Sequence, residues 1–232
     1  YFDILVWIFV QNFGRGLEYE MSICKFGLIP STFSEQSIES SCLGLNRWGY
    51  FSVVSSMFLH GNWMHLLGNL LFLWVFGGNI EDTMGTLRFT AFYLLVGVFA
   101  GFSHIIANFG SLVPMIGASG AIGGVMGAYL MLFPKVKVHI FVPIFIIFWT
   151  FRIPAYLMLG YWIILQFIEG ILNFSTNSEG IAFWAHVGGF LCGAVTIYLF
   201  KDNELLYGHP YYGWYQSKDP SSIWEDSNNR QD

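Results

Sequence analysis

The sequence predicts an all-α, polytopic integral membrane protein that folds as a bundle of six transmembrane helices. Its composition is the first observation: of 232 residues, 55% are hydrophobic and 11% are charged, against about 25% charged in an average soluble domain. The second observation is that only eight charged residues lie between Trp48 and Phe200. A soluble domain could not cover its surface with so few charges, so we expect lipid around this segment.

Charged and turn residues divide this segment into spans, each close to the roughly 20 apolar residues that cross a bilayer. The predicted spans are Trp63 to Ile80, Phe89 to Ala107, Ser119 to Phe133, Ala155 to Leu172 and Ala182 to Phe200. Residues 2–13 are apolar apart from Asp3 and match the end of a first helix that is cut short. The short stretch from Val138 to Phe151 contains Pro143, which indicates an interfacial or re-entrant connection.

The loops indicate how the spans are oriented. Residues 14–62 form a long first loop, and residues 201–232 form a polar tail, expected to be mobile, after a membrane domain of residues 1–200. The even-numbered connections and the start of the tail hold Arg88, Lys135, Lys137, Arg152 and Lys201. The positive-inside rule therefore predicts loops one, three and five outside and a cytoplasmic tail. The formal charge of −5 excludes the basic excess of a nucleic-acid-binding protein.

Three groups of polar residues enter the spans from the same membrane face. His65 and Asn69 are four residues apart and so share one side of their helix. Ser119 begins a later span, and His186 lies about one turn into the last one. Each group alone has a structural explanation, namely hydrogen bonds between helices or a helix N-cap. Because each group follows an odd-numbered loop, however, all four side chains are expected at one depth.

Stripes of glycine predict a close approach between the spans that carry Ser119 and His186. The first span holds Gly120, Gly123, Gly124 and Gly127, and the second holds Gly189 and Gly193. Small residues at this spacing let two helix backbones come together in a membrane. Contact between these stripes would place Ser119 next to His186.

A serine beside a histidine can perform acyl transfer. Neutral imidazole can remove the proton of a weakly nucleophilic hydroxyl and later return it to the leaving amine. The oxyanion of the tetrahedral intermediate needs fixed donors, and Asn69, His65 and the Ser119 backbone N–H are available. Gly117 and Gly120 would leave space for the backbone of a peptide to approach.

These motifs resemble those of the rhomboid intramembrane serine proteases of the six-span bacterial type. The matching segments are FLHGNWMHLLGN at 58–69, GGNIED at 77–82, GASGA at 117–121 and AHVGG at 185–189. The resemblance implies a Ser119–His186 dyad, an oxyanion hole that includes His65 and Asn69, and backbone positions near the site at Gly117, Gly120 and Gly189. It also implies a structural role for Glu81, single-span membrane proteins as substrates, no cofactor or metal, and a bacterial inner membrane.

Two positions depart from the better-known rhomboid pattern. Phe51 and Ser52 stand where many relatives have a Trp-Arg pair in the first loop. Gly123 stands where some relatives have a tyrosine that stacks on the catalytic imidazole. The orientation of the His186 ring is therefore left open, as is the pairing of Cys24 with Cys42 in the first loop.

Other classes of membrane protein fit the sequence less well. It contains no His-Glu-x-x-His helix of a metalloprotease and no pair of carboxylates within spans, as an aspartyl protease or a proton-linked transporter would need. The main alternative is a catalytically silent relative that binds transmembrane helices for quality control. The physiological substrate and the oligomeric state are not encoded in these patterns.

Overall fold

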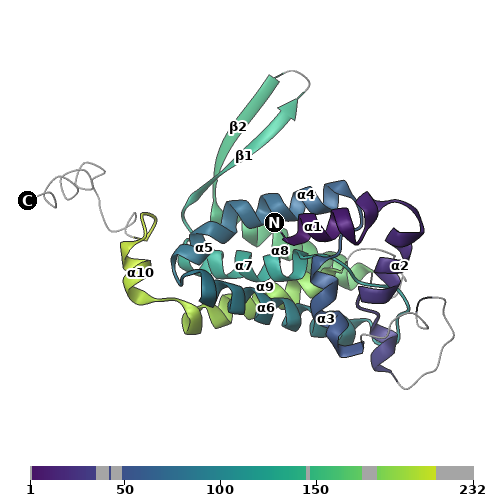
Figure 1. The fold of residues 1–232 in the computed structure, drawn as a ribbon. Helices are drawn as coiled ribbons and strands as arrows, with labels where there is room; N and C mark the ends of the chain where they lie inside the picture. Colours follow the sequence, from purple (N-terminus) through teal and green to yellow (C-terminus); the bar gives the residue numbers. More distant parts are fainter. Residues whose placement is uncertain (1, 35–41, 43–48, 145–146, 174–181, 213–232) are drawn as a thin grey trace, which may run out of the picture.

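The computed structural model describes residues 2–34, 42, 49–144, 147–173 and 182–212, which form a helical bundle with one projecting hairpin (Figure 1). The α-helices and strands are α1 (Phe2–Phe9), α2 (Gly16–Phe26), α3 (Ser52–Ser55), α4 (Trp63–Phe72), α5 (Gly78–Asp82), α6 (Thr86–Ala107), α7 (Ser119–Leu132), β1 (Lys137–Ile144), β2 (Ile147–Pro154), α8 (Ala155–Leu172), α9 (Phe183–Phe200) and α10 (Asn203–Gly208). Short 3-10 turns are η1 (Asn12–Gly14), η2 (Pro30–Phe33), η3 (Gly49–Phe51) and η4 (Ser56–Phe58), and η5 (Leu73–Gly77) is a π-helical turn between α4 and α5.

Within the described residues, four helices are long and apolar enough to cross a membrane. They are the continuous helix Trp63–Asp82, α6, α8 and α9, and their ends lie within a few residues of the predicted ones. The protein is therefore an integral membrane protein. In addition, α1 lies within residues 2–13, the apolar stretch that precedes the first loop.

The helix α7 lies at the centre of the bundle and is shorter than the four spanning helices. All its residues from Gly120 to Tyr129 are buried, and it contacts α6, α8, α9 and η5. Its 14 residues correspond to about 21 Å at 1.5 Å per residue, less than the roughly 30 Å of a hydrocarbon core. Because α7 is short, the residue at its start lies inside the bundle rather than at its rim.

The contact between α7 and α9 is made by backbone against backbone, as the glycine stripes predict. A methyl group added to Gly189 would meet the carbonyl of Gly120, and one added to Gly193 would meet the backbone of Gly124. Only glycine lets the helices come this close at these positions.

The first loop is folded against the third. Cys24 and Cys42 form a disulfide, which answers the question that the sequence left open. The backbones of Leu28 and Met115 exchange two hydrogen bonds of 3.0 and 2.7 Å, which tie loop one to the segment before α7. The Gln11 amide both donates to and accepts from the His60 backbone at 2.8 Å. Loop one thus holds the segments that lead into α4 and α7.

At the opposite end of the bundle, residues 203–212 pack against the spans instead of forming the start of a mobile tail. The Asp202 carboxylate accepts hydrogen bonds from the Glu204 and Leu205 backbones and forms a 3.1 Å ion pair with Arg88. These hydrogen bonds, together with Arg88, lower the pKa of the Asp202 carboxyl. The ring of buried His209 lies 4.7 Å from that of Phe133. Residues 213–232 of the predicted tail lie outside the described residues.

The end of the second span has a local anchor at Glu81. Its side chain accepts a 2.6 Å hydrogen bond from the Thr86 hydroxyl at the start of α6. Its backbone carbonyl accepts hydrogen bonds from Met84 and Gly85. These bonds fix the turn between the second and third spans.

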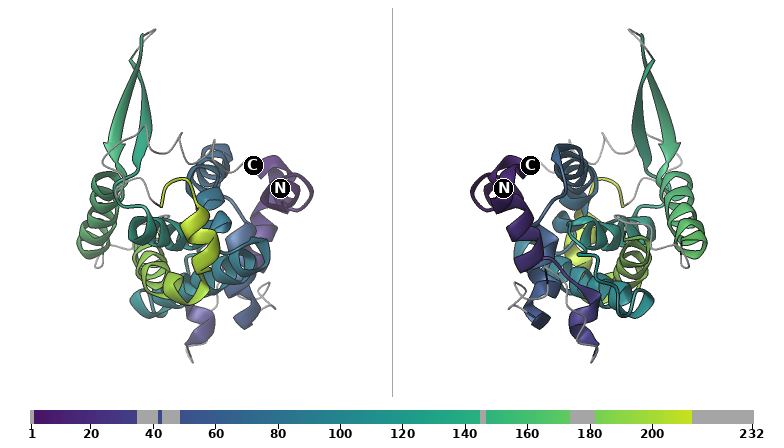
Figure 2. Two further views of the ribbon diagram at one scale, coloured as in Figure 1. Left: turned by 90° about the vertical axis from the view of Figure 1, so that its left-hand side faces the viewer. Right: turned by 90° about the vertical axis from the view of Figure 1, so that its right-hand side faces the viewer.

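The connection between α7 and α8, predicted as interfacial or re-entrant, is an antiparallel hairpin. Lys137 pairs with Pro154 at its base and Ile144 with Ile147 near its tip. The hairpin runs away from the helices in both orientations shown in Figures 1 and 2. Its β-branched and aromatic residues favour strands, which explains why this apolar stretch is not a helix.

Candidate active site

The first residue of α7 and the first turn of α9 bring Ser119 and His186 together. The close crossing of Gly120 and Gly189 places the two helix starts side by side. Ser119 Oγ and His186 Nε2 lie 2.8 Å apart, within hydrogen-bond distance. The nucleophile and base inferred from the sequence are therefore in the geometry that proton transfer requires.

His65 lies next to this pair, at the start of α4. The Asn62 side chain caps this helix by accepting a 2.8 Å hydrogen bond from the His65 backbone. The Gly61 N–H donates to His65 Nδ1 at 3.3 Å, which leaves the ring proton on Nε2. A methyl group added to Gly117 would lie 2.6 Å from His65 Nε2 and 3.7 Å from Ser119 Oγ. The imidazole N–H of His65 thus lies beside the serine hydroxyl, in space that Gly117 leaves open.

Asn69 lies one turn further along α4, on the same side as His65. Its side chain is only 9% exposed, and its Nδ2 has no hydrogen-bond partner within the part of the chain that is described. A buried amide without an acceptor is unfavourable, so such groups usually serve a ligand or a reaction. Asn69 therefore offers a buried donor without a partner, one turn along the helix face that carries His65.

Behind His65 lies a second imidazole, that of His60. Its ring is buried and lies 5.2 Å from the His65 ring in an edge-to-face arrangement. Burial lowers the pKa of His60 to about 4, so this ring is neutral at pH 7. His60 therefore supports His65 without adding a positive charge.

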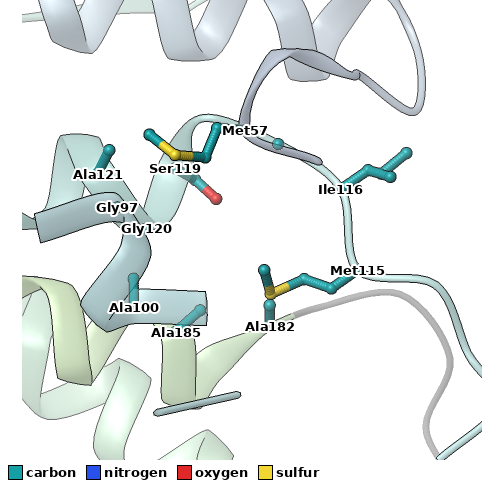
Figure 3. A pocket seen from close by; sticks show the side chains of 11 residues that line it. Met57, Gly97, Ala100, Met115, Ile116, Ser119, Gly120, Ala121, Ala182 and Ala185 are labelled. Atoms are coloured by element: carbon teal, nitrogen blue, oxygen red, sulfur yellow. The ribbon is translucent and has the colours of Figure 1, made fainter. Parts of the chain in front are cut away.

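A small cavity opens beside the serine hydroxyl (Figure 3). Small side chains and glycines from three helices form most of its wall, and two methionines and an isoleucine close it. The lining residues are Met57, Gly97, Ala100, Met115, Ile116, Gly117, Ser119, Gly120, Ala121, Ala182 and Ala185. The Ser119 hydroxyl therefore lies on the wall of a small cavity.

The orientation of the His186 ring is fixed from α8, by two residues that the sequence analysis missed. Gln166 Oε1 lies 2.6 Å from His186 Nδ1, and the Trp162 ring lies 5.7 Å from the imidazole. A methyl group added to Gly123 would lie 3.2 Å from the His186 carbonyl and 3.6 Å from Trp162. The glycine that replaces a tyrosine thus leaves room for an aromatic ring from another helix. One feature of the sequence did point to this contact, because Gln166 is a polar residue within an apolar span.

Across the described ranges, no three His, Cys, Asp or Glu side chains lie close enough together to hold a metal ion.

Comparison with known proteins identifies the family. The model of the Rhomboid domain matches residues 47–203, which is more than half of the chain. The chain belongs to the rhomboid family. It is 29% identical over 178 residues to "Rhomboid protein 1, mitochondrial" of Saccharomyces cerevisiae, an alignment that covers 72% of this chain and 42% of the relative. The matched rhomboid domain includes all the polar residues of the candidate site.

Two further relatives show the range of this rhomboid family. The chain is 28% identical over 177 residues to "Rhomboid-like protein 11, chloroplastic" of Arabidopsis thaliana, covering 72% of this chain and 58% of that one. It is 30% identical over 172 residues to "Rhomboid-like protease 5" of Toxoplasma gondii, covering 72% and 19%. The chain thus spans about half the length, or less, of these curated rhomboid relatives.

Proposed function

We propose that this chain is an intramembrane serine endopeptidase that cleaves transmembrane segments of other membrane proteins. The observation that carries the proposal is the 2.8 Å contact between Ser119 Oγ and His186 Nε2. A silent relative that only binds helices has no need for a hydroxyl held against an imidazole nitrogen. Nor does it need a buried amide without a partner one turn from His65, as at Asn69.

The reaction begins with His186 as general base. As Ser119 Oγ attacks the peptide carbonyl, Nε2 takes the hydroxyl proton, and the carbonyl oxygen becomes an oxyanion. Asn69 Nδ2, His65 Nε2 and the Ser119 backbone N–H donate to it, the last because the first residues of a helix have no intrahelical acceptor. The intermediate collapses when His186 gives its proton to the leaving amine. Water then hydrolyses the acyl-enzyme by the same two proton transfers.

The substrate class follows from the depth of the site. A transmembrane helix must unwind locally to expose a peptide carbonyl to Ser119, so Gly or Pro near the cleaved bond would favour the reaction. The cavity lined by glycine and alanine would accept a small side chain beside that bond. Single-span proteins within the lipid bilayer are the substrates that we propose.

The orientation is also part of the proposal. Loops one, three and five would lie outside, with the site near the outer face and residues 201–232 in the cytoplasm, as the distribution of Lys and Arg indicates. The six-span bacterial type and a bacterial inner membrane stay predictions, since the names of two relatives refer to mitochondria and chloroplasts.

A fluorophosphonate probe tests the proposed function directly. In detergent, the wild-type protein is expected to be labelled at Ser119, because the hydroxyl is activated by His186. Mass spectrometry locates the adduct, and His186→Ala is expected to lose it. Ser103→Ala is the matched control, since this hydroxyl on α6 donates to the Phe99 carbonyl at 2.9 Å. A folded wild-type protein that the probe does not label would favour the binding-only alternative.

A further inference from the structure

We infer that Gln166 is a positioning residue that fixes the tautomer of the base His186. This inference rests on the proposed function, because it concerns how the same imidazole acts. The residue takes the place of the acidic member of a Ser-His-Asp triad, but it uses a neutral amide oxygen. Gln166 lies on α8, outside the sequence motifs that supply the other residues of the site.

The geometry assigns the proton positions on the ring. A neutral imidazole carries one proton, and its two nitrogens have opposite roles. Gln166 Oε1 can only accept, and it lies 2.6 Å from Nδ1. The proton therefore lies on Nδ1, and the lone pair of Nε2 is directed at the Ser119 hydroxyl 2.8 Å away. The opposite tautomer would put a proton on Nε2, where a base cannot use it.

The helix that carries Gln166 also supplies a surface for the ring. Trp162 is four residues earlier on α8, hence on the same side of the helix. Its ring is tilted by 40° to the His186 imidazole, with centroids 5.7 Å apart. α8 thus restrains the base both at Nδ1 and across one ring face.

An amide suits this position better than a carboxylate. Gln166 lies in the middle of a predicted membrane span, where a permanent charge is unfavourable. The amide oxygen gives the same acceptor to Nδ1–H without a charge. Its dipole also favours the imidazolium that forms when Ser119 attacks, though less strongly than an aspartate would.

Two substitutions of Gln166 test this role. In Gln166→Leu the tautomer is no longer fixed, so kcat is expected to fall about 10²-fold with little change in KM. A loss of about 10² lies within the roughly 10²–10⁴-fold that a correctly positioned proton-transfer group contributes. In Gln166→Glu the new carboxylate stabilises imidazolium, so the acid limb of the pH–rate profile is expected to move up by about one pH unit or more.

The control is Glu169→Gln, one turn further along α8. Among the described residues, the Glu169 side chain bonds only to Asn173. This variant is expected to leave kcat and the pH–rate profile unchanged. If Gln166→Leu had the wild-type rate and Gln166→Glu left the acid limb of the pH–rate profile where it is, the inference would be overturned. The proposed function would still stand if the probe labels the wild-type protein. If Gln166→Leu does not fold, the pH profile of Gln166→Glu alone decides. An unlabelled, folded wild-type protein would instead overturn the proposed function.

A separate observation concerns the hairpin β1–β2. We propose that it lies along the membrane surface and binds anionic lipid headgroups. In Figure 2 the spans are seen nearly end-on, whereas the hairpin is seen along its length. It therefore projects sideways from the spans instead of running parallel to them. Both of its ends continue into membrane-embedded helices, α7 and α8, so it stays at the membrane.

The two faces of the hairpin differ in chemistry in the half near its base. The register places His139 opposite Arg152 on one face, which also holds Lys137, all exposed. On the other face Ile140 pairs with Phe151, which is 46% exposed and lies 6.1 Å from the ring of Trp149, itself 54% exposed. Basic residues beside exposed aromatic ones are typical of segments that lie at the headgroup boundary. Their charge complements an anionic leaflet.

Spin labels measure this placement without any need for catalysis. The full chain with Cys192→Ser, reconstituted in equal parts of phosphatidylcholine and phosphatidylglycerol, carries a nitroxide at Phe151→Cys or at Thr150→Cys on the opposite face. The label at Phe151→Cys is expected to collide more with oxygen than with a water-soluble nickel chelate. The label at Thr150→Cys is expected to collide more with the nickel chelate than with oxygen. Equal nickel access at both sites would overturn the proposal. So would spin–spin broadening at Phe151, which would show that a second copy covers this face.

Discussion

Replacing Ser119 by alanine is expected to reduce cleavage of a single-span substrate by about 10⁴-fold or more, to the background rate. The reason is that no acyl-enzyme can form without Oγ, and the oxyanion donors alone retain only a small part of the rate enhancement of a serine protease. The measurement is the appearance of cleaved substrate in proteoliposomes, followed by gel and by mass spectrometry of the products.

Thermal melting in detergent distinguishes this loss from unfolding. Ser119→Ala removes one oxygen from a polar contact and leaves the packing of α7 against α9 unchanged, so its melting temperature should stay near that of the wild type. Ser103→Ala should retain both melting and cleavage. If Ser119→Ala cleaved at the wild-type rate, the mechanism proposed above would be wrong.

The second large effect is expected at Gly193, where α7 and α9 are in backbone contact. A methyl group there would meet the backbone of Gly124, and inserting a methyl group into a close-packed contact typically costs about 1–3 kcal/mol. Gly193→Ala should therefore lower the melting temperature, and Gly193→Val should lower it further. Separation of the two helices would also move His186 away from Ser119, so labelling of the serine should be lost together with stability.

Gly78→Ala provides the matched control. Gly78 has helical φ and ψ, and a methyl group there would have no atom within 4 Å. Alanine is favoured over glycine in a helix, so this variant should melt no lower than the wild type. Wild-type melting and labelling of Gly193→Val would show that backbone contact does not position the site.

The spans and the Ser119–His186 contact could be predicted because each rests on a local pattern. Span lengths follow from the bilayer, and a glycine stripe identifies the side of a helix that packs closely. The depth shared by Ser119 and His186 follows from their distance to the ends of their spans. Together these patterns define which helices meet and which side chains lie at the point of contact.

The environment of the His186 ring could not be predicted in this way. Gln166 contacts His186 only because α8 is rotated to face α9, and no stripe of small residues encodes that rotation. The link between Gln11 and the His60 backbone joins residues 49 positions apart by a single side chain. The hairpin was missed for another reason: a short apolar run has no periodicity that distinguishes a strand from a helix.

The burial of α7 has a consequence for how the protein responds to different membranes. A helix that touches lipid must adapt to bilayer thickness by tilting or by deforming the lipid around it. Since α7 is covered by protein from Gly120 to Tyr129, a thicker or thinner bilayer acts on it only through the neighbouring helices. The distance of Ser119 from the membrane surface can therefore change from one lipid to another while the contacts around it do not.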